Sequence, residues 1–315
     1  MHGQNLNQRA AQLAAIPRGA AECLRIAVSV VEGVTLLDFG VEAEGGLAAG
    51  LLLARLCLSD LAEVRLAAAE DSRVPVPRVL VHTDHPLEAC LMSQYAGWRI
   101  ASDDFFAMAS GPMRAVARKE PLFDTLPPAL DHNTVVGILE AGRLPTTAAL
   151  EQIRHAVGRA RHLILAVART ASQAGQIQIV ARSVETAIHK LHELHFPLSA
   201  LVSGLGNAPL PPVPVDDLQG IGRSNDAILY GATVNLWVRC QDSLIETIGP
   251  QVPSSSSPAH GQKFLTLFEA AERDFYKLDP SLFSPAVVVF HNLSTGRTFR
   301  YGQLLPELVA ESFGF

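Results

Sequence analysis

The sequence has little charge, few aromatic residues and few cysteines for its length. Charged residues occupy 18% of the 315 positions, against roughly a quarter in an average soluble protein. Apolar residues make up 48% and the mean hydropathy is +0.21, which excludes a mostly disordered chain because a large core can form. The length is about twice that of an ordinary domain and predicts two domains. The scarcity of charge predicts that other subunits cover part of the surface.

The sequence also lacks a long hydrophobic run and a basic stripe. The most apolar stretch, Leu47–Leu58, contains Arg55 and is well short of the roughly 20 residues that a membrane-spanning helix needs. The formal net charge is −6, and no cluster of lysine and arginine offers a footprint for nucleic acid. We therefore expect neither a membrane nor a nucleic acid among the partners.

The cysteines are too few and too scattered for a disulfide framework or a zinc site. They include no CxxC pair and stand at Cys23, Cys57, Cys90 and Cys240. This usage is typical of reduced thiols in a cytosolic protein. Residues 1–20 carry only a weakly apolar patch that Pro17 interrupts, so we expect a flexible extension instead of a signal peptide, and a cytoplasmic protein.

Strand-like and helix-like segments alternate along most of the chain, which predicts a mixed α/β (α+β) fold in which sheet packs on helix. Proline-rich breaks at 122–133 and 209–214 are the candidate domain boundaries. From the first break we predict an α/β domain over 21–125 and a second over 126–315. The spacing also predicts a helix over 87–95 and a single long helix over 176–195, which ends before Pro197. Turn residues at Glu32-Gly33 and at 294–297 predict two hairpins, each between strand-like segments.

Familiar catalytic motifs are missing. The chain has no GxxxxGK[ST], HExxH, GxSxG or GxGxxG motif, and Gly220-Ile221-Gly222 is only a fragment of the last. A kinase, dehydrogenase or serine hydrolase of the usual types is therefore disfavoured.

Three histidines, His189, His192 and His195, recur at three-residue spacing near the end of the predicted long helix. Residues three apart share a helix face, so His189 and His192 could ligate a metal in a metal-dependent hydrolase. The favourable position of histidine near a helix C-terminus explains them equally simply. Because no Glu or Cys partner stands at a standard spacing, we favour the second explanation and expect no metal.

Arg182 and Glu185 form a more specific pair on the same predicted helix. They stand three residues apart and are flanked by apolar residues, so both side chains face the same way. An exposed ion pair with little energetic value would have the same spacing. The small-residue approach Thr170-Ala171-Ser172 favours a functional role, since it could expose helix N-terminal amides to an anionic ligand.

Three further polar segments stand out by composition. The first is a tight turn followed by a helix that carries one cation, Ser110-Gly111-Pro112-Met113-Arg114. The second, Asp216-Asp217-Leu218, follows a proline run. Acidic residues are favoured at helix starts, so an ordinary helix start explains the second segment. Arg223-Ser224-Asn225-Asp226 is most simply a structural turn.

Taken together, these segments resemble the methenyltetrahydromethanopterin cyclohydrolase family, in order and in approximate spacing, from about Thr35 to Phe315. The stretches that carry the resemblance include Asp38-Phe39-Gly40-Val41-Glu42, Ala107-Met108-Ala109-Ser110-Gly111-Pro112, Ala181-Arg182-Ser183-Val184-Glu185-Thr186, Asp216-Asp217-Leu218, Leu229-Tyr230-Gly231 and Val252-Pro253-Ser254-Ser255. The sequence departs from the family pattern at Arg169, where a proline is expected, and at Asn207-Ala208-Pro209.

The resemblance implies hydrolysis of the cyclic methenyl cation of tetrahydromethanopterin to the 5-formyl derivative. It implies two α/β domains with a cleft between them, no cofactor and a homotrimer. Glu185 would orient and deprotonate the attacking water, and Arg182 would hold that carboxylate ionised and oriented. The residues that it implies as substrate-binding are Ser110, Gly111, Arg114, Ser172, Gln178, Asp216, Asp217, Asn225 and Asp226. A non-catalytic pterin-binding protein on the same scaffold is the alternative, and the accepted pterin side chain and the physiological direction stay open.

Overall fold

The computed structural model describes residues 5–102, 104–126, 133–158 and 160–315, and the chain divides into two compact units. The first comprises Met1–Ala62 and Glu88–Gln178, and the second comprises Glu63–Leu87 and Ile179–Phe315. Each unit is thus built from two separate segments. The boundary predicted at 125/126 falls inside the first unit, although part of its proline-rich break lies outside the described residues. The break at 209–214 falls inside the second unit.

The first unit contains a six-stranded mixed sheet in the order β1-β2-β8-β7-β6-β5. Strands β2, β8 and β7 run parallel, and the outer pairings are antiparallel. The predicted hairpin around Glu32-Gly33 forms β1 and β2. The elements are α1 (Leu6–Leu13), α2 (Ala15–Gly19), α3 (Ala21–Leu24), β1 (Ala27–Val31), β2 (Val34–Gly40), α4 (Leu47–Cys57), η1 (Leu87–Gln94), β5 (Trp98–Ser102), β6 (Phe105–Ser110), α5 (Met113–Ala117), η2 (Pro121–Asp124), β7 (Thr134–Glu140), α6 (Thr147–Val157), β8 (His162–Ala168) and α7 (Gln173–Val180).

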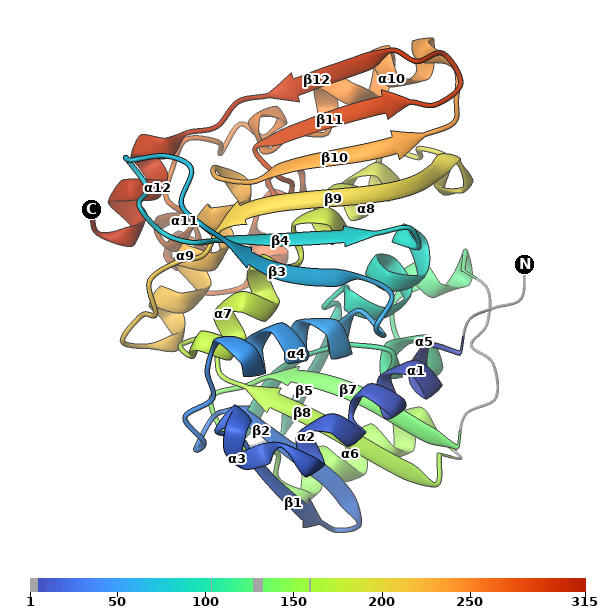
Figure 1. Ribbon diagram of the computed structural model, residues 1–315, viewed down its shortest axis with the longest axis vertical. Coiled ribbons are helices and arrows are strands. Elements are labelled where there is room, and N and C mark those ends of the chain that lie inside the picture. The colour runs from blue at the N-terminus through green and yellow to red at the C-terminus, as the bar shows by residue number, and fades with distance from the viewer. Residues whose placement is uncertain (1–4, 103, 127–132, 159) are drawn as a thin grey trace. The chain divides into compact units, whose positions relative to one another are not determined.

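Helices cover both faces of this sheet. Alternate residues of β7 and β8 point to opposite faces, as the period of a strand requires. On one face they pack with α6 in a cluster that includes Leu150 and Ile153. On the other they pack with α1 and α4, which lie in front of the sheet in Figure 1. Because both faces are buried, the parallel strands consist almost wholly of apolar residues.

Helix α1 corrects the expectation that residues 1–20 form a flexible extension, at least from Asn5 onward. Ala10 and Leu13 belong to the core of the first unit. The buried amide of Asn7 donates to the carbonyl oxygen of Pro112 (3.1 Å) and accepts from the backbone N–H of Val136 (2.9 Å). The side chain of Asn5 caps the helix by accepting from the N–H of Gln8. These tertiary contacts hold a segment whose own sequence is only weakly apolar.

The second unit also contains a six-stranded sheet, in the order β12-β11-β10-β9-β4-β3, and only β10 and β11 run parallel. The predicted hairpin around residues 294–297 forms β11 and β12. The elements are β3 (Glu63–Ala67), β4 (Arg78–Thr83), α8 (Ser183–Glu193), η3 (Leu198–Ala200), β9 (Leu201–Pro209), α9 (Asp217–Leu229), β10 (Thr233–Val238), α10 (Asp242–Ile248), η4 (Gly249–Gln251), η5 (Ser254–Ser256), α11 (Phe264–Ala270), η6 (Phe275–Lys277), η7 (Pro280–Leu282), β11 (Val287–Asn292), β12 (Thr298–Gly302) and α12 (Pro306–Phe313).

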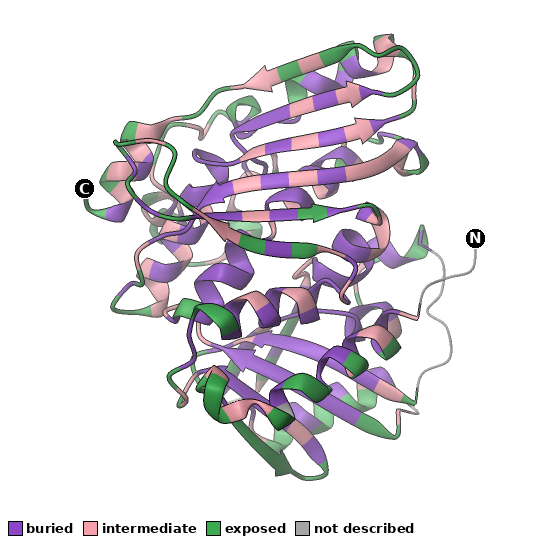
Figure 2. Cartoon of the chain, viewed as in Figure 1, coloured by how far each residue is buried: buried purple, intermediate pink, exposed green. Residues whose placement is uncertain are grey.

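The two faces of the second sheet differ. Along β10 buried residues alternate with half-buried ones, and Figure 2 shows the same alternation across the neighbouring strands. Helix α8 packs behind β9, β10 and β4. The mixed α/β class predicted from the alternating segments is confirmed. Within the described part of the chain, no helix has the length and apolar character that crossing a bilayer demands.

Candidate functional site

The predicted long helix over 176–195 is two helices. Helix α7 ends at Val180, Ala181 and Arg182 form a turn, and α8 begins at Ser183. The break places Arg182 at the N-cap and Glu185 in the first turn of α8. A carboxylate is favoured there because the unpaired amides of a helix N-terminus carry partial positive charge.

Two glycines of β9 let the start of α8 rest directly on the second sheet. A Cβ atom at Gly206 would lie 2.2 Å from Ser183 Oγ, and one at Gly204 would lie 2.6 Å from Val184 Cγ1. Real Cβ contacts are never this short, so any larger residue would push the helix away from the strand. The close approach buries the first turn of α8 and, with it, the side chain of Glu185.

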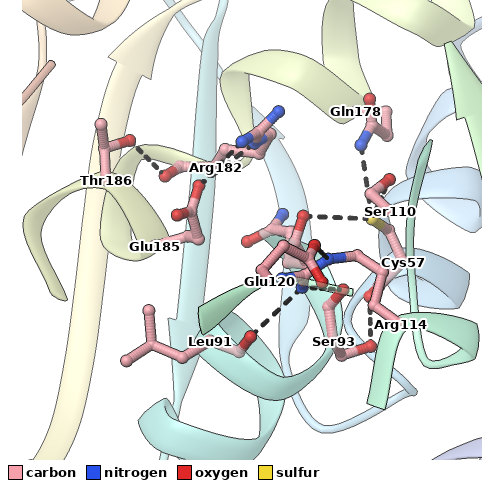
Figure 3. A network of polar contacts seen from close by, with 11 residues as sticks. Cys57, Leu91, Ser93, Ser110, Arg114, Glu120, Gln178, Arg182, Glu185 and Thr186 are labelled. Atoms are coloured by element: carbon pink, nitrogen blue, oxygen red, sulfur yellow. Dashed lines mark hydrogen bonds and ion pairs between the residues drawn. The ribbon is translucent and has the colours of Figure 1, made fainter. Parts of the chain in front are cut away.

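Arg182 and Glu185 form an ion pair of which one member is almost completely buried. The side chain of Glu185 is 3% exposed and that of Arg182 is 18% exposed. Arginine Nε and Nη2 both donate to Glu185 Oε2, at 3.2 and 3.1 Å (Figure 3). Oε1 receives neither of these bonds. Thr186 Oγ1 donates to the carbonyl oxygen of Arg182 (2.7 Å) and steadies the turn. Burial therefore excludes the simpler interpretation of the spacing, that Arg182 and Glu185 form an exposed ion pair of little energetic value.

In the first unit, Ser110 and Gln178 meet at the thiol of Cys57. Cys57 Sγ lies 3.3 Å from Ser110 Oγ and accepts from Gln178 Nε2 at 3.4 Å. All three residues are buried, and they come from α4, β6 and α7 (Figure 3). The carbonyl oxygen of Cys57 in turn accepts from Ser93 Oγ at 2.6 Å. Two predicted substrate-binding residues thus belong to one buried polar cluster.

Arg114 has a structural environment. Its side chain is fully buried, and its Nε donates to Glu120 Oε1 (2.6 Å). Its Nη1 donates to the carbonyl oxygen of Leu91 in η1 (3.2 Å). The guanidinium carbon also lies 4.7 Å from the ring centre of Tyr95 and 5.0 Å from that of Phe123, which stabilises the buried cation. These contacts already occupy most of the guanidinium. The role of Arg114 in substrate binding stays a prediction.

Gly111 and Ser172 occupy turns that need their particular residue types. Gly111 has φ +83°, and a Cβ there would lie 2.7 Å from Ile138 Cδ1, so a side chain would strain the turn twice over. Ser172 Oγ accepts from the N–H of Gly175 (3.0 Å) and donates to the carbonyl oxygen of Arg169 (2.8 Å). Ser172 thus caps the start of α7. It belongs to the small-residue segment before this helix, where the sequence indicated a possible anion site.

The four residues between 216 and 226 that were predicted to bind substrate lie on α9 or directly before it, and most of them stabilise this helix. Asp216 is the N-cap and accepts from the N–H of Gln219 (2.8 Å). Asp217 opens the first turn, and Asn225 donates to the carbonyl oxygen of Ile221. Asp226 is buried and binds two other helices through the N–H of Phe264 (2.8 Å) and Ser312 Oγ (2.6 Å). Their roles toward a substrate stay predictions.

The histidines do not form a metal cluster in the described part of the chain. His189 and His192 lie at 3.9 and 3.5 Å from Glu193 Oε1, and His195 follows the end of α8. Burial lowers the pKa of His189, and the charges of Glu185 and Glu193 partly oppose this shift. Across residues 5–102, 104–126, 133–158 and 160–315, no group of three or more His, Cys, Asp or Glu side chains could hold a metal ion.

Sequence reasoning missed Cys57 as a member of the buried polar cluster, and it missed Gln94, whose backbone carbonyl oxygen lies 3.9 Å from Cys57 Sγ. Gln94 ends η1, a π-helix, and its side chain is fully buried. Nothing local marks either residue, since one lies in an apolar helix and the other in a stretch predicted to be an ordinary helix. The π-helix, a rare form that is frequent at functional sites, appears only in the structure.

Comparison with known proteins gives one consistent result. The family described as cyclohydrolase (MCH) matches residues 5–313. A methenyltetrahydromethanopterin cyclohydrolase of Rhodopirellula baltica is 45% identical, with 95% of each chain covered. Proteins of the same name from Methylobacillus flagellatus and Methanosarcina mazei are each 39% identical, over 94% and 91% of this chain and 91% of their own lengths.

The protein is therefore an enzyme of the hydrolase class, built on two mixed sheets with their helices. The chain belongs to the cyclohydrolase (MCH) family.

The buried carboxylate of Asp226 predicts a specific pH dependence of stability. Burial raises its pKa from 3.8 to about 6, although the bonds from Ser312 and Phe264 oppose the shift. A carboxyl whose folded pKa is raised binds its proton more tightly in the folded state, so this group's contribution to stability falls as pH rises from about 4 to about 6. At about 1.4 kcal/mol per pKa unit the loss amounts to roughly 3 kcal/mol.

Asp226→Asn keeps the shape and the acceptor for Phe264 but carries no charge. We expect the variant's melting temperature, relative to wild type, to rise between pH 4 and pH 7.5, and the difference to level off above pH 7. Thermal unfolding of both proteins across this range measures it. Parallel curves for the two proteins would show that Asp226 titrates normally.

Proposed function

We propose that this enzyme hydrolyses 5,10-methenyltetrahydromethanopterin to 5-formyltetrahydromethanopterin, in a reversible step of pterin-linked one-carbon metabolism. The names of relatives with up to 45% identity support the substrate. The observation that carries the mechanism is the Arg182–Glu185 pair, in which both arginine contacts fall on a single carboxylate oxygen of a side chain that is 3% exposed. We further propose that the protein acts in the cytoplasm.

The substrate is a resonance-stabilised cation whose bridging carbon is electrophilic. Glu185 takes one proton from water through Oε1, and the water oxygen forms a bond to that carbon. The bond from the bridging carbon to N10 then breaks, and N10 takes the proton that Glu185 accepted. The new hydroxyl group releases its proton to solvent as it becomes the carbonyl oxygen of the formyl group, which remains on N5. The sum is one water consumed and one proton released. The negative charge of Glu185 also favours the bound cation, while Arg182 keeps the carboxylate in one orientation.

The charge on the substrate makes a Lewis acid unnecessary, because the carbon under attack is already electron-poor. We therefore propose a reaction without metal or other cofactor. Activity is expected to survive prolonged dialysis against a strong chelator, with rates measured before and after. A stoichiometric metal whose removal abolishes activity and whose return restores it would contradict the proposal and favour a hydrolase that uses His189 and His192.

Glu185→Gln preserves the size of the side chain and removes the base. Turnover should fall about 10²–10⁴-fold, the usual effect of losing a positioned general base. Arg182→Ala should also impair turnover, and the two losses should not add, because the residues act as one unit. The measurement is the initial rate of loss of methenyl-cation absorbance, together with the melting temperature of both single variants and the double variant.

Glu193→Gln provides a matched control, because Glu193 ends the same helix and its side chain is 56% exposed. This variant should keep near-normal turnover. If Glu185→Gln retains more than about a tenth of wild-type turnover, Glu185 is not the general base. If the wild-type protein itself binds the cation without consuming it, the chain is a pterin-binding protein and not this hydrolase.

We also propose that the enzyme is a homotrimer. The low share of charged residues, 18%, supports coverage of part of the surface by other copies. Light scattering on a sizing column should give about three times the chain mass of 33.7 kDa. A monomer at micromolar concentration would refute the proposal.

A further inference from the structure

The helix that carries Glu185 also carries a histidine between that buried carboxylate and the solvent. Glu185, His189 and Glu193 stand four residues apart on α8, so they follow one another along a single face of the helix. Exposure rises in the same order, because the side chain of Glu185 is 3% exposed, that of His189 is 26% exposed and that of Glu193 is 56% exposed. This row therefore leads from the buried carboxylate to the solvent within one element.

Both neighbours in the row interact with the imidazole of His189. Its Nε2 lies 3.9 Å from Glu193 Oε1, so this nitrogen faces the exposed end of the row. The negative charge of Glu185 acts on the same ring and favours its protonated form by raising its pKa. Lys190, the next residue in the chain, interacts elsewhere, since its Nζ donates to the carbonyl oxygen of Ser281 at 3.0 Å.

The proposed hydrolysis leaves one proton to remove from the site. Glu185 passes its first proton to N10, and the hydroxyl group on the bridging carbon then loses a second proton. A carboxylate that is 3% exposed has little contact with water, so this second proton needs a group that carries it outward. An imidazole is suited to this task, because one ring nitrogen can accept a proton while the other releases one.

The surroundings of His189 keep the proton from staying on the ring. Burial lowers the pKa of His189 below its usual value of 6.5. The charged groups that act on this pKa are Glu185 and Glu193, which raise it, and His192 and Arg182, which lower it. Because burial outweighs the two carboxylates, the imidazole is neutral near neutral pH and is ready to accept the next proton.

We propose that His189 is a proton-transfer residue that acts through Glu185 and carries the proton released in each hydrolysis to the solvent. This role rests on the proposed function and on Glu185 as its base. Glu185 takes the proton of the hydroxyl group as the formyl carbonyl forms and transfers it to His189, which releases it to water or buffer. Glu185 returns to the carboxylate and His189 to the neutral ring. Because water accepts the proton, Glu193 is not required, in agreement with the near-normal turnover expected of Glu193→Gln.

His189→Gln tests this role, because glutamine is polar but does not exchange protons as imidazole does. In weakly buffered solution kcat should fall about tenfold or more, a smaller effect than loss of the general base itself. The KM should stay within about threefold, because His189 does not touch the substrate. Adding imidazole should restore most of the lost turnover, since a small proton carrier replaces the side chain. Wild-type turnover should not respond to imidazole.

His192→Gln is the matched control, since it replaces the same residue type on the same helix. The side chain of His192 is 24% exposed, and its Nδ1 lies 3.5 Å from Glu193 Oε1. It stands seven residues from Glu185, about two helical turns away, and is therefore not the next group along from the carboxylate. This variant should keep near-normal turnover at every concentration of buffer.

The melting temperatures separate proton transfer from a structural role. A loss of turnover in His189→Gln that accompanies a lower melting temperature and that imidazole does not restore overturns the proposal. Normal turnover of this variant in weak buffer also overturns it. Should His189→Gln fail to fold, His189→Asn, which has a shorter amide side chain, takes the same measurements with the same expected results.

The wild-type protein distinguishes this proposal from the proposed function. If wild type does not hydrolyse the methenyl cation, the proposed function fails and the role of His189 fails with it. If wild type hydrolyses the cation and both histidine variants match its turnover in weak buffer, the role of His189 fails alone.

Discussion

The contact between the first turn of α8 and the glycines of β9 is the constraint on which the candidate site depends. Because Gly204 and Gly206 have no side chains, Ser183 and Val184 lie directly on the strand, and Glu185 is carried into the interior with them. A buried carboxylate needs a cation close by, and the turn at Arg182 supplies one from the adjoining position. The position of the ion pair therefore depends on the strand and on the turn. A larger residue at either glycine would displace the Glu185 carboxylate without contacting it.

The first unit treats buried polar groups in two different ways. Arg114 contacts a carboxylate, backbone carbonyl oxygens and two aromatic rings. These contacts bind its guanidinium to η1 and hold that segment in place. The side-chain amide of Gln94, at the end of that same helix, has no hydrogen-bond partner within the described residues.

Several residues that attract attention by composition serve the fold first. Asp216 caps α9, Ser172 caps α7, and Asp226 connects α9 with the segments that contain Phe264 and Ser312. Small polar residues at the ends of helices have this local use whether or not a ligand is near. Burial and a second, non-local partner separate Asp226 from the simple caps, and these properties are visible only in three dimensions.

The sequence by itself determined the elements whose causes are local. Alternation and turn residues predicted the hairpins β1–β2 and β11–β12, and three-residue spacing placed Arg182 and Glu185 side by side. Tertiary structure decided the rest. Strand β9 was not predicted, because its glycines have little intrinsic preference for a strand and their lack of side chains matters only where α8 packs against them. The break of the predicted long helix at Ala181 and Arg182 was not predicted either. The units are discontinuous because each sheet recruits strands from distant parts of the chain. Whether a buried amide is bonded or open depends on every neighbour it meets, which no local pattern encodes.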